Sequence, residues 1–294
     1  MVVAPLIVGL LLLAALMHAS WNAILKSDQS DRMATFAVIM MTGSFMGAAM
    51  VPFLPMIEPA AWKFLALSIA IHMAYYFCLL KAYSYGDLSH TYPIARGLGP
   101  LLVALISGRF IGEALRTQDM VGVALLSLGL ITLAWPQRTI VPQPGARHGL
   151  ATLFAVMTGF CIAGYIVADG LGVRSAGPTF DQRISYIAWL ALLEGPWLLG
   201  FVLIRRPRSV FAHVRKTWHR GVIGGAIANI GYGIAIYALV LGPMAHIAAL
   251  RETSVLFGAL MGTLLLGESF GARRVAAATV IVVGLVLMNG PQLV

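Results

Sequence analysis

Charged side chains are scarce in this chain of 294 residues. Only 11% of the residues are Asp, Glu, Lys or Arg, whereas about a quarter are charged in a typical soluble domain. Hydrophobic residues make up 60% of the sequence, and the mean hydropathy is +0.88. This composition excludes an ordinary soluble domain and predicts a polytopic membrane protein.

Cysteine and catalytic motifs are nearly absent as well. The two cysteines, Cys78 and Cys161, both fall inside predicted apolar helices, so a disulfide framework is excluded. The sequence has no GxSxG or HExxH motif, and Glu194 and Glu252 are the carboxylates that we expect inside apolar segments. These features argue against an enzyme that acts on lipids. The absence of a P-loop argues against direct use of ATP, and we expect no cofactor and no metal.

Long apolar segments are plentiful instead. Ten of them approach the roughly 20 residues that cross about 30 Å of hydrocarbon, and short clusters of Pro, Gly and charged residues separate them. The first has neither a basic leader nor a small-residue cleavage site, so we interpret it as a span. Eight or nine helices is the competing count. The ten segments are residues 3–25, 33–54, 62–84, 88–111, 120–135, 150–168, 184–204, 221–240, 244–266 and 275–288.

The basic residues are distributed unevenly among the connections between these segments. If all ten segments cross the membrane, the odd-numbered connections carry 13 of the 20 Lys and Arg, and the even-numbered ones carry five. Arg96 and Arg251 lie within segments. The positive-inside rule then places the odd-numbered connections in the cytoplasm and both termini outside.

The two halves of the sequence resemble each other. Residues 85–113, YGDLSHTYPIARGLGPLLVALISGRFIGE, match residues 241–268, LGPMAHIAALRETSVLFGALMGTLLLGE. Arg96 aligns with Arg251 at an offset of 155 residues. The match indicates a duplicated unit of five predicted helices.

An odd number of helices in each unit determines how the halves are related. The second unit, residues 148–291, must enter the membrane upside down relative to the first, residues 1–140. We therefore predict an all-α membrane protein with ten transmembrane helices in two inverted five-helix repeats. Transporters of this architecture place the substrate site near the midplane between the repeats and reach it alternately from either side.

Two further details carry a resemblance to a known family. HASWNAILK closes the first predicted helix, and a GE pair follows the fourth and the ninth. With ten predicted spans, the chain resembles the drug/metabolite transporter superfamily, in particular its EamA-type ten-helix members, and among these the YddG-type amino-acid exporters. The resemblance implies export of amino acids or similar small metabolites. It also implies cytoplasmic termini, opposite to the charge distribution.

Polar and aromatic side chains inside the segments are the candidates for a substrate site, because isolated polar groups are costly in lipid. On the predicted third helix, His72, Tyr76 and Tyr83 share one face, with Tyr75 beside them. We predict a central cavity with aromatic walls that can hold an ammonium group by cation–π contact. The alternative is that some of these rings are interface anchors. The other helices contribute His18, Trp21, Asn22, Tyr165, Asn229 and Tyr232.

Arg96, Arg251 and Glu252 are the charged candidates, and two interpretations of them stay open. An arginine can bind a substrate carboxylate through two parallel hydrogen bonds. Alternatively, Glu252 or Glu194 neutralises an arginine in an internal ion pair that fixes the packing of the halves. Both interpretations predict that the side chains point into the protein.

The predicted function is therefore that of a secondary transporter, acting as a monomer in the cell (inner) membrane. It exports small metabolites, in particular amino acids, by alternating access, and its partners are this substrate and the lipid bilayer, with no nucleic acid. The alternatives are proton-coupled efflux of drugs or other metabolites, a scaffold or pore, and a lipid-modifying enzyme. Related small multidrug transporters depend on an acidic residue in the first helix, which here has only His18 and Asn22. A facilitative exporter therefore needs the fewest assumptions, although Glu194, Glu252 or His72 could carry a proton.

Overall fold

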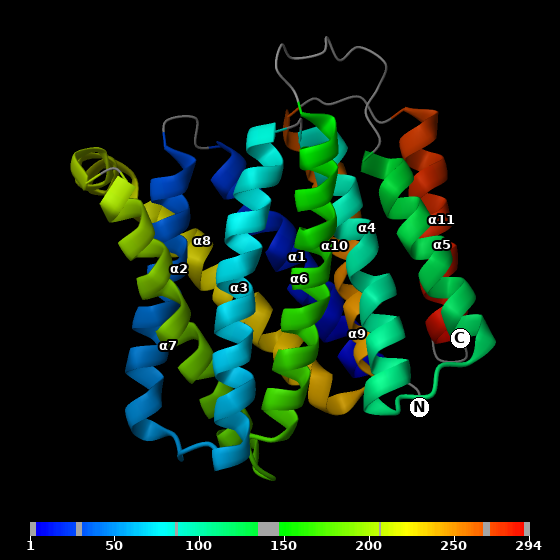
Figure 1. Cartoon of the computed structure of the whole chain (residues 1–294), viewed down its shortest axis with the longest axis horizontal. Helices are drawn as coiled ribbons and strands as arrows, with labels where there is room; N and C mark the ends of the chain where they lie inside the picture. Colours follow the sequence, from blue (N-terminus) through cyan, green and yellow to red (C-terminus); the bar gives the residue numbers. More distant parts are fainter. Residues whose placement is uncertain are drawn as a thin grey trace.

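The computed structural model describes residues 4–27, 31–85, 88–134, 147–205, 207–266 and 271–290. Over these residues the chain forms a bundle of long helices without strands, which confirms the predicted all-α class for the described part (Figure 1). α1 begins and α11 ends at the same end of the bundle. The elements are α1 (Pro5–Ser27), α2 (Arg32–Met50), η1 (Val51–Phe53), α3 (Pro59–Tyr85), α4 (Leu88–Ile106), η2 (Ser107–Ile111), α5 (Thr117–Ala134), α6 (His148–Arg174), α7 (Phe180–Arg205), α8 (Pro207–Leu241), α9 (Met244–Arg251), α10 (Thr253–Leu266) and α11 (Ala272–Asn289).

Most of these helices are suited to crossing a membrane. In the described part of the chain, eight helices have the required length and apolar composition, and Thr117–Leu133 is a shorter apolar helix. The predicted ninth segment, residues 244–266, is divided at Glu252 into α9 and α10. The prediction of a multi-pass helical membrane protein is confirmed, and the count of ten spans stays a prediction.

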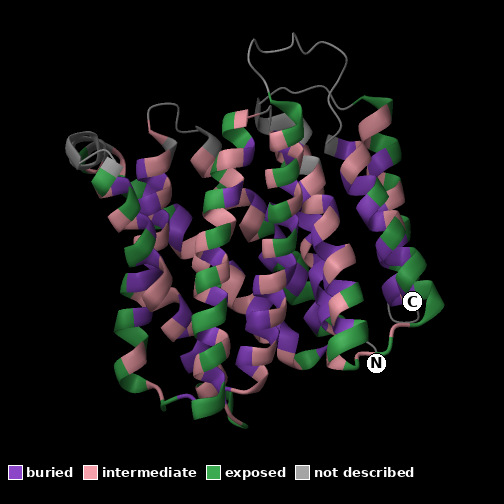
Figure 2. Ribbon diagram, in the orientation of Figure 1, coloured by how far each residue is buried: buried purple, intermediate pink, exposed green. Residues whose placement is uncertain are grey.

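Apolar side chains cover the outside of the bundle, whereas several polar ones lie inside. Phe45, Phe110 and Trp197 are 70%, 80% and 64% exposed. His72 and Asp169 are only 5% and 1% exposed. The outward faces of the helices are largely exposed and the faces between helices are buried (Figure 2). Such an arrangement is unfavourable in water but suits a protein whose surroundings are lipid.

The packing between helices mainly joins the two halves of the chain. α3 packs along α6 and α1 packs along α8. α4 packs on α6, whereas α1 packs on α9 and α10. Further contacts between the halves join α2 to α7 and α5 to α11, and α2 also packs on α8 as α3 does on α7. If each helix is replaced by its equivalent in the other half, every one of these contacts becomes another of them or stays the same. This is expected for two similar units that face each other.

The contact between α5 and α11 is made by small residues at two matching points. A methyl group added at Gly122 would lie 2.6 Å from the carbonyl oxygen of Gly284, and one at Gly129 would lie 3.0 Å from that of Ala277. The repeat offset of 155 relates Gly122 to Ala277 and Gly129 to Gly284. As residue numbers rise along α5 they fall along α11, so the two helices are antiparallel.

We expect Gly284→Leu to destabilise the protein strongly, because the larger side chain forces the backbones of α5 and α11 apart. Overpacking of this kind costs about 3 kcal/mol, and membrane helices depend on small residues for close contact. The unfolding temperature in detergent should fall. Gly9→Leu is the matched control, because a side chain there meets nothing within 4 Å. Equal unfolding temperatures for the two variants would show that the contact is not needed.

Two predicted segments are much shorter than the helices that contain them, although the eighth agrees with the apolar span Thr217–Leu241. The sixth was predicted to stop at residue 168, but α6 continues to Arg174. The extension is possible because the carboxylate of Asp169 is buried against tyrosine hydroxyls instead of facing lipid. The embedded carboxylates therefore include Asp169 beside Glu194 and Glu252. The eighth segment was predicted to start at residue 221, but α8 begins at Pro207.

Candidate substrate site

A cavity of about 100 Å³ lies inside the bundle and is lined by residues of both halves. Several water molecules fit this volume. Nine of the thirteen predicted site residues contribute to it, so the predicted aromatic and polar lining is present. Four residues that were not among the predicted substrate-site residues complete the wall: Phe36, Met40, Glu194 and Ala228. The predicted residues in the lining are His18, Trp21, His72, Tyr75, Tyr76, Tyr165, Asn229, Tyr232 and Arg251.

The aromatic wall is held together by contacts between rings from different helices. Trp21 of α1 stacks on Phe36 of α2 at 6.0 Å between ring centres, and Phe36 meets the edge of Tyr76 of α3 at 5.6 Å. His72 of α3 stacks on Tyr165 of α6 at 4.2 Å. These contacts hold the rings in place before any ligand binds, so part of the entropic cost of ordering a binding site is already met.

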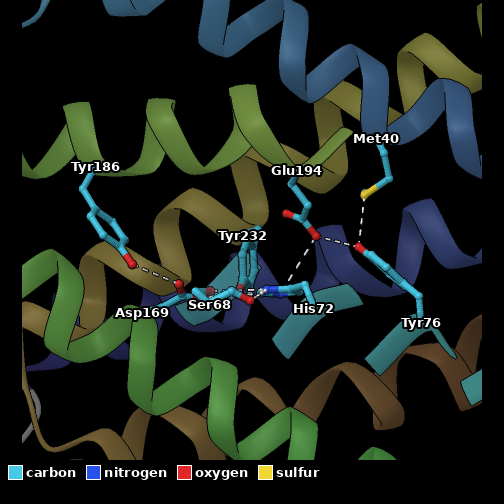
Figure 3. Close-up of polar contacts among 8 residues, drawn as sticks. All are labelled: Met40, Ser68, His72, Tyr76, Asp169, Tyr186, Glu194 and Tyr232. Atoms are coloured by element: carbon cyan, nitrogen blue, oxygen red, sulfur yellow. Dashed lines mark hydrogen bonds and ion pairs between the residues drawn. The ribbon is translucent and has the colours of Figure 1, made fainter. Parts of the chain in front are cut away.

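Asp169 of α6 is the centre of a buried hydrogen-bond network that was not predicted from the sequence (Figure 3). The hydroxyl of Tyr232 donates to its Oδ2 at 2.6 Å, and the hydroxyl of Tyr186 lies 3.3 Å from its Oδ1 as a second donor. The carboxylate is 1% exposed and does not line the cavity. Its two oxygens are thus occupied by fixed donors from α7 and α8.

His72 connects this network to a second carboxylate, Glu194 of α7 (Figure 3). Its Nδ1 lies 2.9 Å from the carbonyl oxygen of Ser68. Its Nε2 lies 3.4 Å from the hydroxyl oxygen of Tyr232 and 4.0 Å from Oε1 of Glu194. The hydroxyl of Tyr76 donates to the same Oε1 at 2.6 Å. Two carboxylates from α6 and α7 are therefore linked through one imidazole.

Arg96 of α4 forms an ion pair across the two halves. Its Nη2 lies 3.0 Å from Oε2 of Glu252, which is 4% exposed, and donates to the hydroxyl of Ser254 at 3.2 Å. Arg96 lines a recess of about 10 Å³, which is space for about one water molecule and shares His18, Tyr232 and Arg251 with the main cavity. The geometry matches the ion-pair interpretation for Arg96 and Glu252.

Arg251 has different surroundings, although the repeat makes it the counterpart of Arg96. Its guanidinium lies 5.1 Å from the ring centre of Tyr232 and lines both the cavity and the recess. Within the described part of the chain, no carboxylate oxygen lies within 4 Å of it. The repeat offset of 155 aligns Glu252 with Gly97, where an added Cβ would lie 2.7 Å from Ile131. The first half therefore has no carboxylate at the position equivalent to Glu252. Arg251 has no repeat-related counterpart of the Arg96–Glu252 ion pair.

The structure places four predicted site residues outside the cavity: Arg96, which lines the recess, and Asn22, Tyr83 and Glu252. Asn22 is exposed and its amide donates to the carbonyl of His18, one turn earlier in its own helix. Tyr83 is 37% exposed and stands about 16 Å along α3 from His72. Glu252 is buried against Arg96 instead of facing the cavity. The predicted face of α3 was correct, but the cavity is shorter than the helix.

A second polar cluster joins the connections at the end of the bundle where α6 and α8 end. Glu113 accepts a hydrogen bond from Nη1 of Arg174 at 2.8 Å and one from the backbone of Met244 at 2.8 Å. Arg174 also donates to the carbonyl oxygens of Leu239 and Gly242. This Glu113–Arg174 cluster fastens the end of η2 in the first half to α6, α8 and α9 in the second.

Comparison with known proteins gives a consistent result. The model of the EamA-like transporter family matches residues 5–135 and 149–290. A WAT1-related protein of Arabidopsis thaliana is 26% identical over 166 residues, 53% of this chain and 43% of its own. A chloroplastic WAT1-related protein of the same plant is 22% identical over 198 residues, 66% of this chain and 46% of its own. The chain thus aligns with less than half the length of these relatives.

The fold is also found among solved structures. One crystal structure superposes with a TM-score of 0.74 and 16% identity, covering 98% of this chain and 96% of the other. At this identity the likeness concerns the fold alone. The family model matches twice in succession, once in each half of the sequence.

Proposed function

Because the chain belongs to the EamA-like transporter family, we propose that this small-molecule transporter of the drug/metabolite type carries amino acids out of the cell across the inner membrane. The substrate binds in the central cavity, and the two halves, acting as inverted repeats, expose it to one side of the membrane at a time. The transporter works as a monomer, since the cavity is lined by residues of both halves of one chain.

The arrangement of charges in the cavity supports this substrate class. Arg251 offers a guanidinium with no described carboxylate oxygen within 4 Å, and Glu194 offers a carboxylate on another wall of the same cavity. An α-carboxylate fits the first and an α-ammonium fits the second. The aromatic rings between them suit an apolar side chain or a cation. A drug that is a simple apolar cation would use Glu194 but would leave Arg251 without a partner, so the zwitterion fits better.

Uptake into proteoliposomes tests the proposal. Vesicles loaded with one unlabelled amino acid should accumulate the same labelled amino acid by counterflow without ATP, for at least one of the twenty standard amino acids. The control is a set of empty vesicles made from the same lipid. If no amino acid enters faster than in the control, while a labelled cationic drug does, the substrate class is wrong but transport stands.

Alternating access requires that the Glu113–Arg174 cluster breaks in each cycle. In Arg174→Glu, two negative side chains repel each other at the end of the bundle where α6 and α8 end and hold it apart. We therefore expect counterflow to slow severalfold and residues near Gly242 to be labelled more readily by reagents from the water. The double variant Glu113→Arg with Arg174→Glu restores the opposite charges and should recover much of the rate. Failure of the double variant to recover, with both variants folded, would mean that the ion pair does not control this end.

A further inference from the structure

The small recess next to the central cavity is lined by two arginines, one from each half of the chain. It has a volume of about 10 Å³ and includes Arg96 of α4 and Arg251 of α9. Its other polar residues are His18, Tyr232 and Ser254, and the rest of its lining is alanine and glycine. Among the described residues of this lining there is no carboxylate. The recess therefore concentrates positive charge at the junction of the two halves.

Several polar groups of the recess are hydrogen-bond donors that a ligand can use. The guanidinium of Arg251 has no described carboxylate oxygen within 4 Å, and no described residue accepts a hydrogen bond from it. The hydroxyl of Ser254 accepts from Arg96 at 3.2 Å, so its own hydrogen can be donated. Nδ1 of His18 accepts the indole hydrogen of Trp21 at 3.3 Å, so a neutral imidazole carries its hydrogen on Nε2. Donors from α1, α9 and α10 are thus available to one ligand.

The carboxylates nearest to the recess have partners of their own. Glu252 pairs with Arg96 at 3.0 Å. Asp169 accepts from the hydroxyl of Tyr232 at 2.6 Å, and the ring of Tyr232 lies 5.1 Å from the guanidinium of Arg251. A cation that is shielded from water is unfavourable without a counter-ion. An anion in the recess would supply that counter-ion to Arg251 and would accept from the donors around it.

We infer that the recess binds one small monatomic anion, chloride, and that this ion and the substrate carboxylate compete for Arg251. The size of the recess selects the ion, because about one water molecule fits it. Chloride is only slightly larger than a water molecule, whereas a carboxylate or phosphate group has several heavy atoms and does not fit. The competition rests on the proposed function and deepens it, whereas the ion site does not depend on it.

The position of Arg251 explains why the two anions compete. Its guanidinium lines both the recess and the cavity, so chloride approaches it from one side and the substrate carboxylate from the other. Once either anion has neutralised this charge, the second gains less attraction and meets the repulsion of the first. Each anion therefore lowers the affinity of the other, by the same factor in both directions.

Binding measurements on the purified protein in lipid nanodiscs test the inference. Chloride is titrated into a gluconate buffer of constant ionic strength, and the NMR line width of the chloride nucleus is recorded. Gluconate is too large for the recess. The wild-type protein should broaden the chloride line saturably, beyond nanodiscs without protein. Isothermal titration calorimetry with each of the twenty standard amino acids should then give a severalfold weaker apparent affinity in chloride than in gluconate.

Two variants assign the chloride to the recess. Arg251→Gln should abolish the saturable broadening, because the counter-charge of the ion is lost. Ser254→Ala should weaken chloride binding by about tenfold, because a hydrogen bond to a charged group is lost, and it should affect amino-acid binding in gluconate far less, since Ser254 does not line the cavity. Ser127→Ala is the matched control, because it removes a buried hydroxyl from α5, which contributes no described residue to the recess.

The outcomes separate this inference from the proposed function. No saturable broadening by the wild-type protein would overturn the ion site and leave amino-acid transport standing. Saturable broadening with equal amino-acid affinities in chloride and gluconate would overturn the competition. Chloride binding that is unchanged in folded Ser254→Ala and Arg251→Gln would overturn the assignment to the recess. If chloride binds and no amino acid does, the proposed function fails, and the competition with it, whereas the ion site is supported.

Discussion

Replacing Arg251 by Gln should reduce amino-acid counterflow by roughly 30-fold to 150-fold while the protein still folds. The guanidinium is the group in the cavity that can bind the substrate carboxylate, and hydrogen bonds to charged groups contribute about 2 to 3 kcal/mol. Folding should be affected less than by the loss of Arg96, because Glu252 keeps its 3.0 Å ion pair with Arg96 when Arg251 is replaced. The measurement is kcat/KM for counterflow in proteoliposomes, together with the unfolding temperature.

Arg220→Gln is the matched control for this variant, because Arg220 is exposed on α8, away from the cavity. It should transport at the wild-type rate. A second comparison uses labelled amines that lack a carboxylate. If such amines are carried at all, Arg251→Gln should affect them far less than amino acids. An equal loss for both classes of compound would contradict the role of Arg251 as the carboxylate anchor.

Replacing Arg96 by Met should, in contrast, mainly lower the stability of the folded protein. The change leaves Glu252 as a buried carboxylate without its cation, and breaking one side of a buried ion pair costs about 3 to 5 kcal/mol. The unfolding temperature and the yield of purified protein should both fall sharply. Arg96 and Arg251 are equivalent in the repeat, so the pair of variants compares one residue type in two environments.

The double variant Arg96→Met with Glu252→Met is the control for this expectation. Removing both charges leaves no uncompensated group, so much of the lost stability should return. If the double variant is as unstable as Arg96→Met alone, the loss comes from packing and not from the orphaned carboxylate. If Arg96→Met is fully stable, the ion pair does not hold the halves together.

Much of the fold could be predicted because membrane helices are marked by simple physical features. Apolar length identified the segments, and the repeat indicated how the halves are related. The boundary at Asp169 was missed because a search for apolar segments stops at the first charged residue. Whether a carboxylate ends a membrane helix depends on its partners, which here are Tyr186 and Tyr232 on two other helices. No local pattern in the sequence contains that information.

The candidate site was predictable in its residue types but less so in its geometry. Helical spacing correctly put His72 and Tyr76 on one face, but spacing alone does not say how far a cavity extends along a helix, and Tyr83 lies beyond it. The different environments of Arg96 and Arg251 could in principle have been predicted from the sequence. At the offset of 155, Glu252 aligns with Gly97, so one arginine of the pair lacks its acid.

The most direct test of the account asks whether the substrate passes through the central cavity. Ala228 lines both the cavity and the recess and is 8% exposed. In a background with Cys78→Ala and Cys161→Ala, an Ala228→Cys variant is treated with a methanethiosulfonate reagent and counterflow is measured. We predict that modification stops counterflow and that a saturating transported amino acid slows the modification. A fully modified variant that transports at the unmodified rate would contradict the account.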